Sequence, residues 1–174
     1  MTFGFKTAKR RGNHFDLAAY AVRRLAKANL LLKGKKERSF EMAIVGFLEA
    51  SPRLRKYLIT QVGDEEIEKI SRAHLFGFRH RPDTAIGRDG TAIELKVIDS
   101  APAVRLLLGQ ALAYRMNYRF VILVLVDRTP DRAIVRLCKN RKSREYALLN
   151  GLARQFNIFT VVGPAGRGRN LLFI

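Results

Sequence analysis

The sequence predicts a single α/β domain in which helices flank a mixed central β-sheet. Three observations predict it. Gly87-Arg88-Asp89-Gly90 is turn chemistry between two strand-like runs, residues 100–117 repeat apolar side chains at helical spacing, and residues 120–126 are an unbroken apolar run. Such a run is typical of a strand buried on both faces. A hairpin, a helix and a buried strand in succession therefore indicate an α/β fold.

The composition is that of a folded and strongly basic protein. The chain has 174 residues, of which 48% are hydrophobic, enough for one domain with its own core. Its 33 Lys and Arg against 15 Asp and Glu give a formal net charge of +18. Such an excess of positive charge concentrates polyanions at the surface. DNA is therefore the expected partner, and an anionic membrane surface is the second candidate.

Other features of the composition exclude several classes of protein. No apolar stretch approaches the roughly 20 residues of a transmembrane helix, so we expect no membrane-spanning segment, and we prefer DNA to a membrane as the partner. The first residues lack the order of a signal peptide, and the single cysteine, Cys138, suits a reducing compartment. We therefore expect an intracellular protein that is not secreted. Three scattered histidines and one cysteine offer no zinc-binding spacing.

The N-terminal residues 1–38 are predicted to be an extension of the domain. Residues 1–12 combine Lys and Arg with two glycines and indicate a flexible basic arm. Apolar residues then recur every three or four positions from residue 14 to residue 32, which predicts a helix. Asn13 could cap this helix and Gly34 could stop it.

The remaining core, residues 39–174, is predicted to begin with a second helix. Ser39 is its expected cap, and Pro52 should end or kink it. The acidic cluster at residues 63–68 is predicted to be a loop. It should lead into the first strand of the sheet, over residues 67–78.

The C-terminal part is predicted to add two helices and a last core strand. Thr129 is the expected cap of the first helix after the buried strand, since a proline follows it. A basic run at residues 139–144 then precedes another helix, and residues 158–162 should form the last core strand. The apolar residues 171–174 are expected to pack on a partner subunit or on an edge strand.

The predicted hairpin brings two carboxylates and an ammonium to one patch. Because side chains alternate along a strand, Glu94 and Lys96 share the face opposite the apolar residues of that strand. A loop of two or four residues places Asp83 directly across from Glu94. A loop centred on Asp89 and Gly90 keeps Asp83 on the same face, and only a three-residue loop would break the arrangement.

A positive charge is needed in this patch, because facing carboxylates repel each other. Lys96 or a divalent cation could supply it. Mg²⁺ takes oxygen ligands, usually one or two carboxylates with water and substrate phosphates, and lowers the pKa of a bound water. Lys96 could orient or deprotonate that water, or stabilise the charge that develops on phosphorus. The alternative is an ordinary exposed hairpin with a charged face.

Pro82-Asp83, ten further residues, and Glu94-Leu95-Lys96 together resemble the signature of the PD-(D/E)xK nuclease superfamily. That family has a restriction-endonuclease-like α-β-β-β-α-β core, and most members are Mg²⁺-dependent phosphodiesterases that act on DNA. The resemblance implies that Asp83, Glu94 and the backbone carbonyl of Leu95 bind one or two Mg²⁺ (or Mn²⁺). It also implies that Lys96 orients or activates the attacking water.

The resemblance implies further site residues on two helices. The family usually has a glutamate on the helix before the strands, which reaches the same metal. Glu41 is the expected residue here, and Glu49 and Asp16 are the alternatives. Gln110 and Tyr114 are four residues apart and so share one helix face. They resemble the Gln-x-x-x-Tyr accessory motif of recombination exonucleases and are expected to line the site.

The function implied by the resemblance is that of a metal-dependent DNA endonuclease. A homodimer is expected, because two-fold pairing is the commonest oligomer and suits cleavage of two strands. A non-catalytic DNA-binding protein on the same fold and an RNA-directed nuclease remain open alternatives. Phosphate contacts would position nucleic acid without reading its sequence. The basic residues expected to make them are Lys9, Arg10, Arg11, Arg23, Arg24, Arg81, Arg141, Lys142, Arg167 and Arg169.

Overall fold

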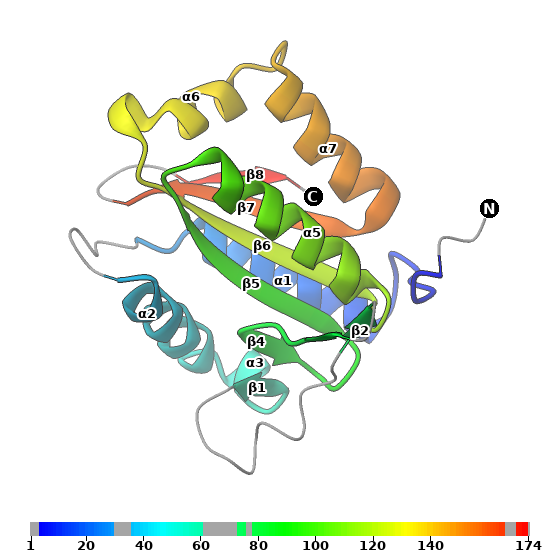
Figure 1. Ribbon diagram of the computed structural model, residues 1–174. Helices are drawn as coiled ribbons and strands as arrows, with labels where there is room; N and C mark the ends of the chain where they lie inside the picture. The colour runs from blue at the N-terminus through cyan, green and yellow to red at the C-terminus, as the bar shows by residue number, and fades with distance from the viewer. Residues whose placement is uncertain (1–3, 30–35, 61–72, 76–77, 166–169, 174) are drawn as a thin grey trace.

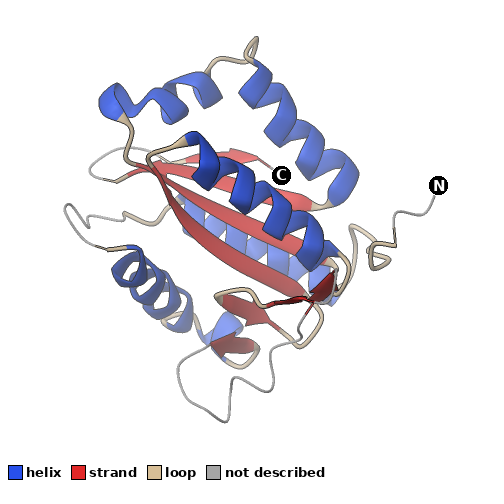
Figure 2. Ribbon diagram, in the orientation of Figure 1, coloured by secondary structure: helices blue, strands red, loops and turns tan. Residues whose placement is uncertain are grey.

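A six-stranded β-sheet forms the centre of the protein, with helices on both of its faces (Figures 1 and 2). The computed structural model of the chain describes residues 4–29, 36–60, 73–75, 78–165 and 170–173. In spatial order, the strands are β1 (Leu58–Thr60), β4 (Thr84–Ile86), β5 (Thr91–Ile98), β6 (Phe120–Asp127), β7 (Ile158–Pro164) and β8 (Leu171–Phe173).

The sheet is mixed, which confirms the predicted fold class. β1, β4 and β5 pair antiparallel, β5, β6 and β7 pair parallel, and β8 adds an antiparallel edge. Parallel neighbours need a crossover connection, and helices supply it here. The crossovers are α5 (Ala101–Arg115) between β5 and β6, and the short 3₁₀ helix η1 (Pro130–Arg132), α6 (Ala133–Lys139) and α7 (Arg144–Phe156) between β6 and β7.

Each face of the sheet has its own apolar core. α1 (Asn13–Ala26) lies behind the sheet in Figure 1 and packs on one face together with α2 (Glu37–Glu49). α5, α6 and α7 pack on the opposite face. β5 contributes to both cores by alternation, as predicted, because Ile93, Leu95 and Val97 face the α1 side. Ala92 and Ile98 face the α5 side.

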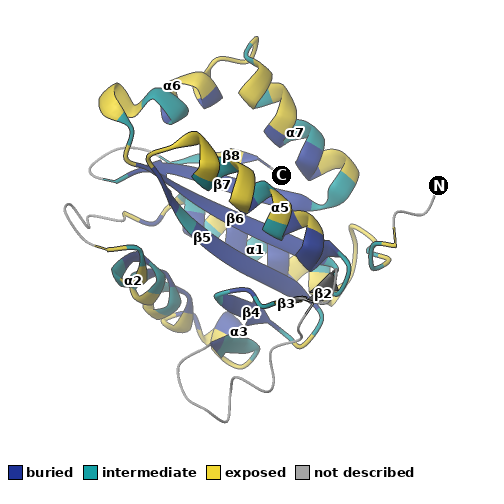
Figure 3. Ribbon diagram, in the orientation of Figure 1, coloured by how far each residue is buried: buried dark blue, intermediate teal, exposed yellow. Residues whose placement is uncertain are grey.

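The elements around β6 agree with the sequence predictions. Every residue of β6 is buried, as expected for a strand covered on both faces (Figure 3). α5 begins directly after Ser100, and Ser143 caps α7 by accepting a hydrogen bond from the backbone N–H of Tyr146 at 3.0 Å. The C-terminal apolar residues 171–173 pair with β7 and so form the edge strand β8 themselves.

The N-terminal arm was wrongly predicted to be flexible over its described part. The ring of Phe5 packs edge-on against Phe156, with centroids 5.9 Å apart, and the Lys6 N–H donates to the Arg115 carbonyl at 2.9 Å. Arg115 is buried and its guanidinium donates to the carbonyls of Lys6, Tyr118 and Phe156. Satisfying this buried cation therefore ties the arm to the ends of α5 and α7.

The boundaries of the first two helices also differ from the predictions. α1 ends at Ala26, before the predicted stop at Gly34, which lies outside the described residues. α2 begins at Glu37 with Lys36 at the N-cap position, so Ser39 is not the cap. Glu37, which the sequence placed in the N-terminal extension, therefore lies in the first turn of α2.

The segment between α2 and β4 contains more strands than predicted. α3 (Pro52–Arg55) and β1 follow α2, so the first strand of the main sheet precedes the predicted position at residues 67–78. In the described part of that segment, β2 (Ala73–Leu75) and β3 (Phe78–His80) form a separate antiparallel hairpin. The acidic cluster at residues 63–68 lies outside the described residues.

Within the described part of the chain, no helix has both the length and the apolar character needed to cross a bilayer.

Candidate active site

The hairpin formed by β4 and β5 sets Asp83 across from Glu94. Thr84 pairs with Ile93 and Ile86 with Thr91, so the loop contains the four residues 87–90. Continuing this register by one pair brings Asp83 opposite Glu94, which is the arrangement predicted from a four-residue loop. Gly87 has a φ of +69°, a conformation that glycine adopts without a steric cost.

The outer edge of β5 explains why carboxylates gather there. β4 pairs only with the first three residues of the eight-residue strand, so it leaves the backbone of Leu95 and Val97 unpaired on that side. The Leu95 N–H donates instead to Asp83 Oδ2 at 2.9 Å, and the Val97 N–H donates to Glu37 Oε2 at 3.1 Å. Buried N–H groups need acceptors, so the edge of β5 itself holds two acidic side chains in place.

Glu94 is the most deeply buried carboxylate of the site, with 5% of its surface exposed. Its Oε2 accepts a hydrogen bond from the backbone N–H of Asp83 at 3.3 Å and lies 3.0 Å from the Tyr114 hydroxyl. The same hydroxyl lies 3.0 Å from the carbonyl of Arg81. Burial, and then the charge of Asp83, raise the pKa of Glu94 to about 8.

Asp83 is also difficult to ionise. Burial raises its pKa to about 6, with added repulsion from Glu41 and Glu37, although the Leu95 N–H favours the charged form. The two facing carboxyls therefore behave as one coupled group, which retains about one proton near neutral pH. A positive charge between them would release that proton.

Lys96 is already engaged by a carboxylate that the sequence did not single out. Its Nζ lies 2.5 Å from Glu37 Oε1. Burial lowers the pKa of Lys96, but the hydrogen bond to Glu37 and the attraction of Glu37, Glu94 and Asp83 outweigh it, and the pKa ends above its ordinary value. Lys96 is therefore an ammonium at neutral pH and acts as a hydrogen-bond donor, not as a base.

Glu41 lies one turn after Glu37 and so on the same face of α2. Burial, and then the charge of Glu37, raise its pKa, and its own charge acts on Asp83. Glu41 therefore borders the site. Among the described residues of α2, Glu37 makes the direct contacts, with Lys96 and with the Val97 N–H. The alternatives, Glu49 and Asp16, are exposed, and no described contact joins either of them to the site. The four-residue spacing of Glu37 and Glu41 was the available signal, obscured because the helix was expected to start later.

The two residues of the accessory pattern have different environments. Tyr114 is buried and reaches Glu94, as expected. Gln110 lies one turn earlier on α5 and is half-buried, with an Oε1 that finds no hydrogen-bond partner among the described residues. Burying an unpaired acceptor costs about 1–3 kcal/mol, so this amide has capacity for a further contact.

The donor set matches the preferences of a hard divalent cation. No group of three or more His, Cys, Asp or Glu side chains suited to a metal is found in the described ranges. However, Asp83 Oδ1 and Glu94 Oε1 accept no hydrogen bond from any described residue. The Leu95 carbonyl points to the same side as its N–H, because both groups of a strand residue face one neighbour. Two carboxylates and a carbonyl are ligands that Mg²⁺ accepts.

No family model, curated protein or solved structure matches this chain. The functional argument therefore rests on the geometry and the charge of the site.

The predicted nucleic-acid contacts fall into four groups. Arg10 and Arg24 have internal partners: Arg10 Nε donates to Asn157 Oδ1 at 3.0 Å, and Arg24 donates twice to the Phe47 carbonyl, at 3.0 and 2.9 Å. Arg81 is half-buried beside Tyr114. Arg167 and Arg169 lie outside the described residues. The exposed residues of the set whose side chains have no internal partner among the described residues are Lys9, Arg11, Arg23, Arg141 and Lys142.

Proposed function

We propose that this protein is a metal-dependent deoxyribonuclease, an endonuclease that hydrolyses phosphodiester bonds of DNA and binds Mg²⁺ or Mn²⁺ through Asp83, Glu94 and the Leu95 carbonyl. The observation that carries the proposal is the facing pair of buried carboxyls whose pKa values are raised to about 6 and about 8. Holding two such groups together without a cation destabilises the fold, and perturbed acids of this kind cluster at functional sites.

The order of elements supports the same proposal. α2, β1, β4, β5, α5 and β6 follow one another as a helix, three antiparallel strands, a helix and a parallel strand, with the β2–β3 hairpin inserted. This is the order expected of the restriction-endonuclease-like core that we propose. The net charge of +18 supports a polyanionic substrate.

Each residue of the site has a role in the proposed reaction. A cation bound by the two carboxylates would polarise the phosphoryl oxygen and acidify water. The Lys96 ammonium orients the attacking water and stabilises the negative charge that builds up on the phosphate. Glu37 positions Lys96, and Tyr114 favours the ionised form of Glu94 by hydrogen bonding. The water oxygen bonds to phosphorus and gives up a proton to the solvent. The phosphorus–oxygen bond to the leaving alkoxide breaks, and that oxygen takes up a proton from the solvent.

The decisive experiment compares the wild type with Asp83→Asn on plasmid, linear and branched DNA, with Mg²⁺ or Mn²⁺ and with EDTA. We expect cleavage by the wild type only, and only with metal. Glu49→Gln, an exposed carboxylate of α2, is the matched control and should cut normally. Equal cutting by the wild type and Asp83→Asn would remove the proposed site. Binding without cutting by either protein would identify a non-catalytic DNA-binding protein.

A further inference from the structure

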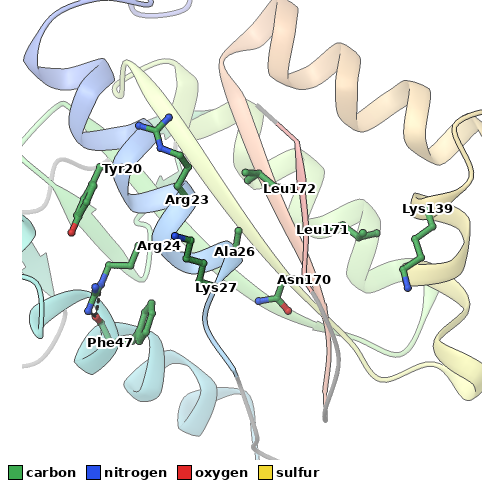
Figure 4. Close-up of a pocket in the computed structure, with 10 residues that line it drawn as sticks. All are labelled: Tyr20, Arg23, Arg24, Ala26, Lys27, Phe47, Lys139, Asn170, Leu171 and Leu172. Atoms are coloured by element: carbon green, nitrogen blue, oxygen red, sulfur yellow. Dashed lines mark hydrogen bonds between the residues drawn. The ribbon is translucent and has the colours of Figure 1, made fainter.

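A basic hollow of about 1070 Å³ lies on the face of the sheet opposite α5. Its walls come from α1, α2, the C-terminal end of α6 and β8 (Figure 4). Among the described residues that line it, none is a carboxylate and four are cationic: Arg23, Arg24, Lys27 and Lys139. The hollow is distinct from the acidic site, because Glu94 contacts Tyr114 on the α5 side of the sheet.

The cations of the hollow are not neutralised within the fold. Arg23, Lys27 and Lys139 are exposed, and none of them pairs with a carboxylate among the described residues. Only Arg24 has an internal role, through its two hydrogen bonds to the Phe47 carbonyl. Arg23 and Lys27 stand at the end of α1 and Lys139 at the end of α6, where each helix end favours its own cations. Neither helix end alone explains why cations from two helices meet in one hollow.

The walls of the hollow are fixed and partly aromatic. Asn170 Nδ2 donates to the carbonyls of Leu25 and Ala28, at 3.1 and 2.8 Å, and so fastens the start of β8 to the end of α1. Tyr20 and Phe47 add two rings to the lining. Grooves that bind single-stranded nucleic acid combine cations along the path of its phosphate backbone with aromatic rings on which its bases stack. A hollow of about 1070 Å³ is too small to enclose a DNA duplex, which could only lie across its mouth.

We propose that this hollow binds a single-stranded segment of nucleic acid through its phosphates, with Arg23, Lys27 and Lys139 as the contacts. The choice of nucleic acid as the polyanion rests on the proposed function. Binding in the hollow needs neither the metal nor the acidic pair, so it can be measured separately from cleavage.

The test measures binding of a fluorescent oligothymidylate by anisotropy in EDTA, over a range of salt concentrations. The triple variant Arg23→Gln, Lys27→Gln, Lys139→Gln is compared with a variant of equal charge from the opposite side of the sheet. That control carries glutamine at three exposed arginines of α5 and α7: Arg105, Arg144 and Arg154. Each lost phosphate contact on a single strand lowers the slope of log affinity against log salt by about 0.7.

The triple variant is expected to lose about tenfold or more in single-strand affinity near 0.15 M salt, with a slope lower by about 2. The control should lose clearly less, and both variants should melt like the wild type. Equal losses in the two variants would overturn the proposal, and so would equal losses on duplex and single strand. Loss of binding only to anionic phosphatidylserine vesicles would assign the hollow to a membrane surface instead. A wild type that shows the expected binding but never cuts DNA refutes the proposed function and leaves this inference standing.

Discussion

Replacing Glu94 by glutamine should change how the stability of the metal-free protein depends on pH. A rise in the pKa of Glu94 from 4.5 to about 8 means that the folded state binds this proton more tightly than the unfolded state. The sign follows from that: the contribution is fully present below the unfolded pKa and is lost as pH rises to the folded pKa. The loss is at most about 1.4 kcal/mol for each pH unit.

The full rise in the pKa of Glu94 corresponds to a loss of roughly 5 kcal/mol of folding stability at high pH. Because Glu94 shares its proton with Asp83, the observable loss is reduced to roughly 3–5 kcal/mol. Glutamine has no proton to lose, and its carbonyl can still accept the hydrogen bonds that Glu94 Oε2 accepts. We therefore expect Glu94→Gln to gain roughly 3–5 kcal/mol of stability relative to the wild type between pH 5 and pH 9.

Urea denaturation in EDTA at pH 5, 7 and 9, followed by circular dichroism, measures this difference directly. The Glu49→Gln variant, at an exposed position of the same helix that supplies Glu37, should run parallel to the wild type throughout. If Glu94→Gln also runs parallel to the wild type, then burial does not strain the carboxyl pair and the reasoning fails.

Three further predictions follow from the contacts of the site and its support. Tyr114→Phe removes a hydrogen bond that lowers the pKa of Glu94, so the acidic limb of the pH–cleavage profile should move to higher pH. An unmoved limb would refute the proposal that Tyr114 favours the ionised form of Glu94. Lys96→Ala should keep DNA affinity within a few fold of the wild type and lose cleavage in a plasmid assay. A large loss of DNA affinity, with the cleavage rate per bound complex unchanged, would count against a catalytic role for Lys96. Arg115→Met leaves three backbone carbonyls without their donor and should cost roughly 3–5 kcal/mol in urea denaturation. A cost below 1 kcal/mol would show that the arm does not depend on this cation.

The sequence was sufficient for elements whose signal is local. The turn residues 87–90 located the hairpin, and every expected loop except one of three residues kept Asp83 on the face of Glu94. The structure has the four-residue loop. The apolar run of β6 and the helical spacing of α5 were equally clear, because both faces of the strand and one face of the helix must be buried.

The sequence was insufficient where distant segments decide the structure. Glu37 accepts a hydrogen bond from Val97, 60 residues away, because β4 is too short to cover the edge of β5. The local sequence pattern shows neither that β4 is short nor that α2 begins before Ser39. Likewise, a run of basic residues gave no sign that the N-terminal arm would satisfy a buried Arg115.

The most direct test of the central claim is a crystal of the protein soaked in Mn²⁺, with anomalous diffraction recorded near the manganese edge. We expect a peak between Asp83 and Glu94, within about 2.5 Å of both carboxylates and of the Leu95 carbonyl, and no peak in crystals of Asp83→Asn. An empty site in the wild type at saturating Mn²⁺, with the carboxyls still facing each other, would contradict the account.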